Sequence, residues 1–171
     1  AFERTVVTTD SPFDRYARGE KNALSKLEKD GLEIFTGKGH CNSCHWGPYF
    51  SDGRFHNLGV REYDPAKPDM GRFDVTKNPA DKGAFKTPTI RDVALRAPYM
   101  HSGSEKTLEE VVDLYDKGGR VKNPNLDPLI VPLGLSNYEK KALVSFMKIS
   151  MTSTNPEVAN VKPVPASELP K

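Results

Sequence analysis

Cys41 and Cys44 are the only cysteines of the chain, and His45 follows them directly. The spacing C-x-x-C-H is typical of a c-type haem attachment site, because each thiol can add to one haem vinyl group while the imidazole reaches the iron. A redox dithiol would need a βαβ context, and a zinc half-site would need a second ligand pair; the sequence offers neither. We therefore predict one covalent haem with His45 as the proximal iron ligand.

A helix is predicted just before this motif. Ser25 and Glu28 form a capping box, in which a hydroxyl and a carboxylate satisfy free amide groups of the first helical turn. Apolar residues follow at helical spacing, and Gly37 and Gly39 favour the left-handed backbone at which helices end. This helix would deliver Cys41 to the haem.

Two more capping boxes predict helices in the second half of the chain. Thr107 with Glu110 opens one of them, and Ser136 with Glu139 opens the last helix. Tyr115 shares the apolar face of the first of these two helices. We therefore expect Tyr115 to point inward.

The segment 46–86 shows no helical or strand period and is rich in Gly, Pro, Asp and Asn. So long a stretch without regular structure is uncommon in a compact domain unless it packs on something or has a function. We expect it to wrap the haem. A short helix is predicted from Thr87 to about Leu95, in which Arg91 could bind a haem propionate or could be a surface or structural arginine.

These patterns predict an all-α fold: a cytochrome c-like helical domain with long loops wrapped around one covalent haem. We divide the 171 residues into a lead-in segment (1–24), one haem domain (25–150) and an extended C-terminal tail (151–171). The apolar fraction of 36% is below the roughly 45–50% of soluble domains, a figure that also counts glycine. The haem would therefore form part of the core.

The net charge and the hydropathy pattern exclude two classes of partner. A net charge of +2 with scattered lysines does not favour nucleic acid. No apolar run is long enough to span a membrane, and we recognise no signal-peptide pattern in the residues given. Because bacteria attach haem to cysteines outside the cytoplasm, we predict a periplasmic protein and interpret Ala1 as a processed end.

Several motifs resemble the bacterial dihaem cytochrome c peroxidase and MauG-like family. They are, in chain order, Ala1–Thr5 (AFERT), Ser11–Tyr16 (SPFDRY), Phe85–Arg91 (FKTPTIR), Ala97–Gly103 (APYMHSG) and Leu133–Leu135 (LGL). The resemblance runs from residue 1 to about residue 150 and covers only the C-terminal half of the family. It implies a haem domain that passes electrons to a second, peroxide-reacting haem in the N-terminal half.

The sequence has one C-x-x-C-H motif where the family has two. The missing half would hold the reactive haem, the tryptophan between the haems and part of a calcium site; Trp46, which directly follows the attachment motif, is not that tryptophan. By resemblance, carbonyls near Arg96 and Pro98 would face the calcium, but without the other half we do not expect calcium to bind. Residues 1–5 resemble the last helix of the missing half, so we expect 1–24 to be an inter-domain connection in a fragment or split subunit.

The resemblance also points to the distal iron ligand. In the family this ligand comes from the helix after the Pro-Tyr-x-His turn, as methionine in the peroxidases and as tyrosine in the MauG-like branch, and the matching residue is Tyr115. Its phenolate would suit ferric iron, although tyrosines on apolar helix faces are more often core residues. Met100 is the main alternative, followed by His56 and His101. We interpret His40 as a solvated loop residue.

Two functions remain open from the sequence. The favoured function is electron transfer by a six-coordinate haem. The alternative is a peroxidase that reacts with hydrogen peroxide at this haem, although no residue can be identified from the sequence as the acid or base that this reaction needs. As partner we expect another haem protein or haem domain, or a second copy of the chain. Phe2, Phe13 and Tyr99 suggest an exposed apolar patch for that contact.

The attachment motif yields the first prediction. The purified protein should carry one haem that survives denaturation, because thioether bonds hold it, and intact-mass measurement should show one haem added to the chain. A protein of apo mass, or one that releases haem into acid-acetone, would contradict the assignment of Cys41 and Cys44.

Overall fold

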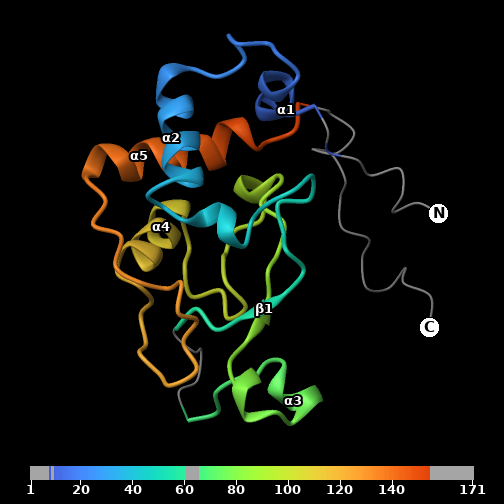
Figure 1. Cartoon of the computed structure of the whole chain (residues 1–171), viewed down its shortest axis with the longest axis vertical. Helices are drawn as coiled ribbons and strands as arrows, with labels where there is room; N and C mark the ends of the chain where they lie inside the picture. Colours follow the sequence, from blue (N-terminus) through green and yellow to red (C-terminus); the bar gives the residue numbers. More distant parts are fainter. Residues whose placement is uncertain (1–7, 9, 61–65, 155–171) are drawn as a thin grey trace, which may run out of the picture.

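The computed structural model describes residues 8, 10–60 and 66–154. Within these residues lie five α-helices: α1 (Pro12–Ala17), α2 (Lys26–Thr36), α3 (Phe73–Thr76), α4 (Leu108–Asp116) and α5 (Asn137–Ser145). Short 3₁₀ turns occur at Cys41–Ser43, Pro79–Asp81 and Val93–Leu95, and a π-helical segment, Phe146–Ser150, continues α5. Figure 1 shows α2 crossing α5 and α3 at the opposite end of the molecule. None of the described helices is long and apolar enough to cross a bilayer.

The expected all-α fold is wrong, because the structure contains a small antiparallel sheet. β1 (Phe55–His56) pairs with β2 (Phe85–Lys86), with Phe55 opposite Lys86 and His56 opposite Phe85. Strands of two residues are too short to leave the alternating pattern by which a strand is recognised in a sequence. The segment 46–86, which also contains α3, was therefore predicted as loop.

The capping boxes predicted at Ser25, Thr107 and Ser136 all form. In each, the hydroxyl accepts a hydrogen bond from the third helical amide, and the glutamate there accepts one from the cap amide. Ser11 and Asp14 make a fourth box, which opens α1. That helix was not predicted, although the same type of signal was present in the sequence.

The helix predicted from Thr87 to Leu95 is also wrong. Only Val93–Leu95 forms a turn of 3₁₀ helix. Asp92, just before it, has a left-handed φ of 54°, which a continuous right-handed helix does not accommodate. The carboxylate of Asp92 accepts a hydrogen bond from the Ser153 amide instead, at 2.6 Å.

Residues on both sides of the haem domain predicted at 25–150 pack against the rest of the described chain. Ser11 and Leu24 on one side and Met151 on the other are buried. The Ser153 hydroxyl donates to the Asp10 carboxylate at 2.6 Å, which joins the two ends of the described chain. These ends are therefore part of one body with the helices between them.

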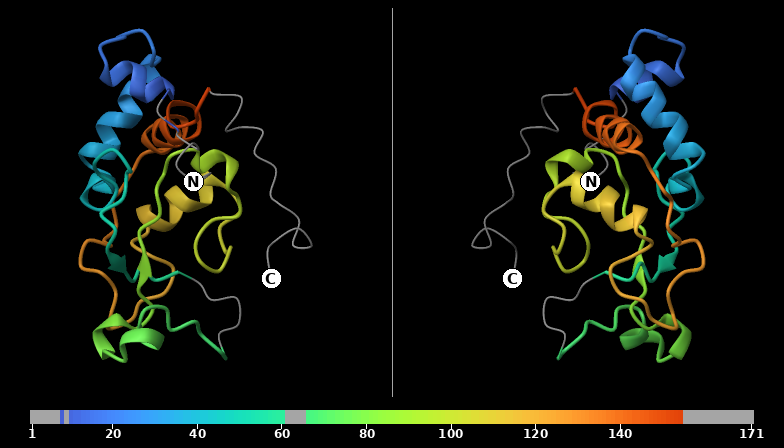
Figure 2. Two further views of the ribbon diagram at one scale, coloured as in Figure 1. Left: turned by 90° about the vertical axis from the view of Figure 1, so that its right-hand side faces the viewer. Right: turned by 90° about the vertical axis from the view of Figure 1, so that its left-hand side faces the viewer.

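The core lies where α2, α4 and α5 meet, and Figure 2 shows α1, α2 and α5 together at one end of the molecule. Phe13, Phe35, Phe50 and Phe146 form an aromatic cluster with ring centroids 5.2 to 6.4 Å apart. The apolar patch expected from Phe13 and Tyr99 is thus not found, since both side chains pack against this core. Phe2 lies outside the described residues.

The crossing of α2 and α5 yields the second prediction. A Cβ on Gly31 would lie 2.1 Å from the Ala142 carbonyl oxygen of α5. Gly31→Ala should therefore lower the free energy of unfolding by about 1–3 kcal/mol or more, although alanine would favour an isolated helix by about 1 kcal/mol. Glu33→Ala, on the exposed face of α2, is the control and should stay within about 0.5 kcal/mol. Denaturant unfolding measures both, and a Gly31→Ala protein more stable than the wild type would contradict this packing.

Candidate haem-binding site

A cavity of about 790 Å³ lies among α4, α5, the two strands and the loops between them. Its volume falls within the roughly 300–1,000 Å³ of ligand sites in proteins. Cys41, Cys44, His45, Met100 and Tyr115 all line it. The structure therefore brings together the residues that the sequence offered for haem attachment and for both sides of the iron.

The attachment motif occupies a tight turn after α2. A Cβ on Gly39 would lie 2.8 Å from the Ile34 carbonyl oxygen, so the turn needs glycine there, and His40 has a left-handed φ of 52°. The His45 amide donates to the Cys41 carbonyl at 2.9 Å. The turn thus directs two thiols and one imidazole into the same cavity.

Both cysteines are free thiols in surroundings that disfavour ionisation. Burial raises the pKa of Cys41 to about 12 and that of Cys44 to about 11. Reactive dithiols and zinc sites depend on thiolates, which form where the thiol pKa is lowered. This environment suits thiols that become uncharged thioethers.

His45 is oriented by its own turn. Its Nδ1 lies 3.0 Å from the carbonyl oxygen of Phe50, to which it donates a hydrogen bond, and this leaves Nε2 for a metal. Burial lowers the pKa of His45, which favours the neutral imidazole that binds iron. A hydrogen bond from the second ring nitrogen to a carbonyl is the usual support of a metal-bound histidine.

Tyr115 reaches the cavity from the last turn of α4. Burial raises its pKa, so the free side chain is a neutral phenol. Its side chain is half-buried and lines the cavity. This hydroxyl is therefore suited to bind a group held in the cavity.

The alternative distal ligands differ in whether other contacts in the structure already engage their side chains. Met100 lines the cavity from a residue with a left-handed φ of 67°, so it remains an alternative. His101 stacks on the Phe85 ring with centroids 3.6 Å apart. His40 is exposed at the edge of the cavity, as expected of a loop residue.

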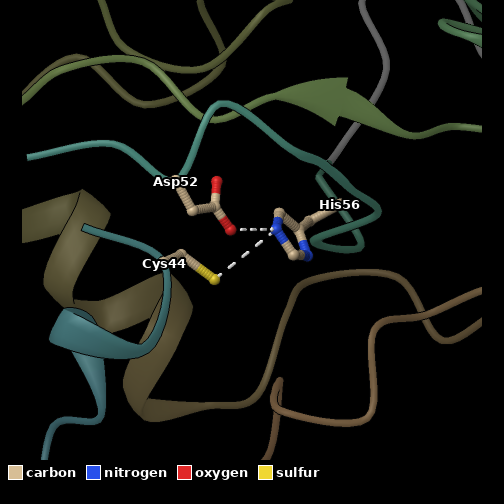
Figure 3. A group of neighbouring side chains, drawn as sticks. All are labelled: Cys44, Asp52 and His56. Atoms are coloured by element: carbon tan, nitrogen blue, oxygen red, sulfur yellow. Dashed lines mark hydrogen bonds and ion pairs between the residues drawn. The ribbon is translucent and has the colours of Figure 1, made fainter. Parts of the chain in front are cut away.

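His56 is held between two carboxylates, of which Figure 3 shows Asp52. Its Nε2 lies 2.9 Å from Asp52 and its Nδ1 lies 2.6 Å from Asp127. Burial acts to lower the pKa of His56, but the hydrogen bonds with Asp127 and Asp52 outweigh it, and the pKa is raised. Since both ring nitrogens are engaged, His56 is not free to bind iron. Asp52 and Asp127 were missed at the sequence level, because Asp127 lies 71 positions from His56 and nothing in the sequence links them.

The structure does not bring Arg91 into the cavity lining. Its guanidinium makes two hydrogen bonds with Asp14, at 2.9 and 3.0 Å, and it also donates to the carbonyls of Thr8 and Pro48. This geometry does not support our expectation that Arg91 binds a haem propionate. It agrees with the other possibility, that Arg91 is a structural arginine. Arg96 does line the cavity.

The residues present fit a haem. The cavity walls are largely apolar, and no Asp or Glu of the described chain lines them. Such walls match a flat apolar macrocycle. The two thiols supply the attachment points of a c-type haem, and the imidazole and the phenol supply candidate iron ligands. This agreement rests on the side chains themselves.

Comparison with known proteins agrees with this geometry. No family model matches the chain. The cytochrome-c peroxidase IdrP2 of Denitromonas iodatirespirans is 40% identical over 172 residues, which cover 86% of this chain and 46% of that protein. The methylamine utilization protein MauG of Methylorubrum extorquens is 40% identical over 149 residues, 86% of this chain and 41% of that protein. The crystal structure of a MauG-like protein associated with microbial copper homeostasis matches 92% of this chain and 57% of its own, with a TM-score of 0.80 and 34% identity.

The chain is homologous to the cytochrome c peroxidases and MauG-like proteins. This confirms the resemblance inferred from the sequence motifs. The chain spans about half the length of these relatives. What the whole relatives do therefore reaches this chain only as a proposal.

The Arg91–Asp14 pair yields the third prediction. Burial would raise the pKa of Asp14, but the hydrogen bonds from Arg91 and Ser11 outweigh it and lower that pKa. The stability gained is present above the unfolded pKa of about 3.9 and is lost as the pH falls through the lower folded pKa. Asp14→Asn should cost about 1.5–3 kcal/mol at neutral pH, because it breaks hydrogen bonds between charged groups, and should leave the haem spectrum unchanged.

Denaturant unfolding and absorption spectra check this prediction. Asp74→Asn is the control, since the exposed Asp74 lies 3.8 Å from Lys77 and such pairs contribute little. An Arg91→Lys protein with wild-type stability and an altered reduction potential would instead favour the propionate role.

Proposed function

We propose that this chain is a monohaem c-type cytochrome domain that transfers electrons, equivalent to the C-terminal half of the dihaem cytochrome c peroxidases and MauG-like proteins. The observation that carries the proposal is the convergence of the C-x-x-C-H turn and Tyr115 on one apolar cavity. We infer one covalent haem. When bound, the haem supplies a one-electron change between ferric and ferrous iron.

Each residue of the site has a separate task. Cys41 and Cys44 would hold the cofactor through thioether bonds. His45 would offer Nε2 to the iron, with its ring fixed by the Phe50 carbonyl. Tyr115 would offer its hydroxyl oxygen from α4, as a phenolate if it binds the iron. The apolar walls would limit the access of water to the bound haem.

Electron transfer is favoured over reaction with peroxide at this haem. A peroxidase site needs an open iron position with an acid or base beside it. No carboxylate of the described residues lines the cavity. Of the histidines that line it, His56 is already bound by Asp52 and Asp127, and His101 stacks on the Phe85 ring. Tyr115 would also help to hold the iron and so would compete with peroxide for it. Peroxidase activity at this haem stays the second candidate, to be considered if Tyr115 proves labile.

We propose a periplasmic location, since haem is attached to such motifs outside the bacterial cytoplasm. We also propose a second haem-bearing domain or protein, or another copy of the chain, as partner. The support for it is that the relatives are about twice as long as the matched region. Sedimentation and co-purification of a haem protein test this partner.

The distal ligand yields the fourth prediction. Tyr115→Phe keeps the ring but removes the donor oxygen, so it should open the sixth position, change the ferric absorption spectrum, allow cyanide to bind and raise the reduction potential. An anionic phenolate stabilises ferric iron, whereas a neutral thioether stabilises ferrous iron.

Met100→Leu is the matched control, because it replaces the other candidate ligand with an apolar side chain of similar size and should leave spectrum and potential nearly unchanged. If Met100→Leu alters the ferric spectrum and Tyr115→Phe does not, the haem is a His/Met centre of high potential and the assignment of Tyr115 is wrong.

A further inference from the structure

His56 joins three segments that surround the cavity. It belongs to β1, its Nε2 faces Asp52 at 2.9 Å in the segment after the attachment motif, and its Nδ1 faces Asp127 at 2.6 Å in the loop between α4 and α5. Its Nε2 also lies 3.7 Å from the sulfur of Cys44 (Figure 3). Because each ring nitrogen faces a carboxylate oxygen, both nitrogens must carry a proton for both contacts to be hydrogen bonds. The ring is therefore an imidazolium.

The two carboxylates are themselves fixed to the backbone around the site. The Asp52 amide donates to the Cys44 carbonyl at 2.8 Å, which ties Asp52 to the attachment turn. The Asp127 amide donates to the Asn57 carbonyl at 2.9 Å, and the Asp127 carboxylate accepts from the Leu129 amide at 2.8 Å. Leu129 and the adjacent Ile130 line the cavity.

We propose that His56, held between Asp52 and Asp127, is a positioning residue for the bound haem: it fastens the 121–131 loop to the attachment turn and keeps a positive charge beside Cys44. The proposal rests on the proposed function only in that the haem is attached at Cys44. In a half-buried site a nearby cation favours the reduced, less positive iron, so the charge of His56 raises the reduction potential. Asp52 and Asp127 oppose it, and these two carboxylates and Cys44 are the titratable groups that contact the ring.

A metal ion at Cys44, Asp52 and His56 is the competing interpretation. Their ligand atoms lie within 4.8 Å of one another. Once Cys44 is a thioether it offers only a weak neutral donor, and the remaining pair is already satisfied as a hydrogen-bonded ion pair. The geometry therefore favours the positioning role.

The experiment compares the wild type with His56→Gln and Asp127→Asn as full-length haem proteins. Asn125→Ala is the matched control, since it removes another hydrogen bond of the same loop, to the Pro79 carbonyl, without touching the cavity. The first readout is amide hydrogen exchange of residues 121–131. Both test variants should exchange at least about tenfold faster there, because a charged hydrogen bond is lost, and the control should remain close to the wild type.

The second readout is the reduction potential at about pH 6. This pH lies below the ordinary histidine pKa of about 6.5, so His56 should stay charged in Asp127→Asn as well, where only Asp52 remains as its partner. His56→Gln removes a positive charge and should lower the potential, whereas Asp127→Asn removes a negative charge and should raise it. A purely structural role, in which both variants only loosen the loop, would move both potentials in the same direction. Shifts of one sign, or no shift in either variant, would overturn the proposal.

Two further arms keep the outcomes distinct. If His56→Gln does not accumulate, Asp127→Glu replaces it in the comparison. Asp127→Glu keeps the negative charge and should leave the potential near the wild-type value, whereas Asp127→Asn should raise it. Equal shifts of the potential in these two variants would overturn the proposal. Intact mass reports haem attachment independently. A wild type without covalent haem overturns the proposed function, whereas a haem-loaded wild type whose variants do not shift the potential overturns only the role of His56.

Discussion

The close crossing of α2 and α5 is the constraint on which the haem site depends. Gly31 lets the two backbones meet at Ala142, and the rings of Phe35 and Phe146 pack together beside the crossing, with centroids 5.4 Å apart. Because α2 ends shortly before Cys41, the crossing fixes where the attachment turn begins. The packing of α2 therefore helps to set the direction of both thiols and of the His45 imidazole, although none of these residues belongs to α2.

Much of the remaining cavity wall comes from loops, and charged hydrogen bonds fix several of the loops of this fold. Arg120 pairs with the buried Glu105 at 2.9 Å, and Arg91 pairs with Asp14 at the same distance. Removing one partner of such a pair leaves a buried charge, which costs more than the pair itself contributes. The main effect of each pair is therefore to exclude other arrangements of its loop, and its net contribution to the free energy of unfolding is smaller.

The sequence predicted what depends on neighbouring residues. The capping boxes at Ser25, Thr107 and Ser136 are local signals, and all three formed where expected. The placement of Tyr115 at the cavity follows from helical periodicity alone. The attachment motif is equally local, since its five consecutive residues carry the chemistry by themselves.

What could not be predicted depends on contacts between distant residues. The β1–β2 pair is too short to leave a pattern, so the all-α expectation was wrong, and the left-handed Asp92 ended a predicted helix for a reason that lies in its contact with Ser153. The charge pairs follow the same rule. An arginine such as Arg91 has the same sequence signature whether it meets a haem propionate or an aspartate 77 positions away. Only the fold decides between these partners, and here it assigns the guanidinium to the protein and leaves the cavity wall mostly apolar. Such a wall suits an apolar macrocycle. The macrocycle would supply apolar surface to the core of a chain that has few apolar residues.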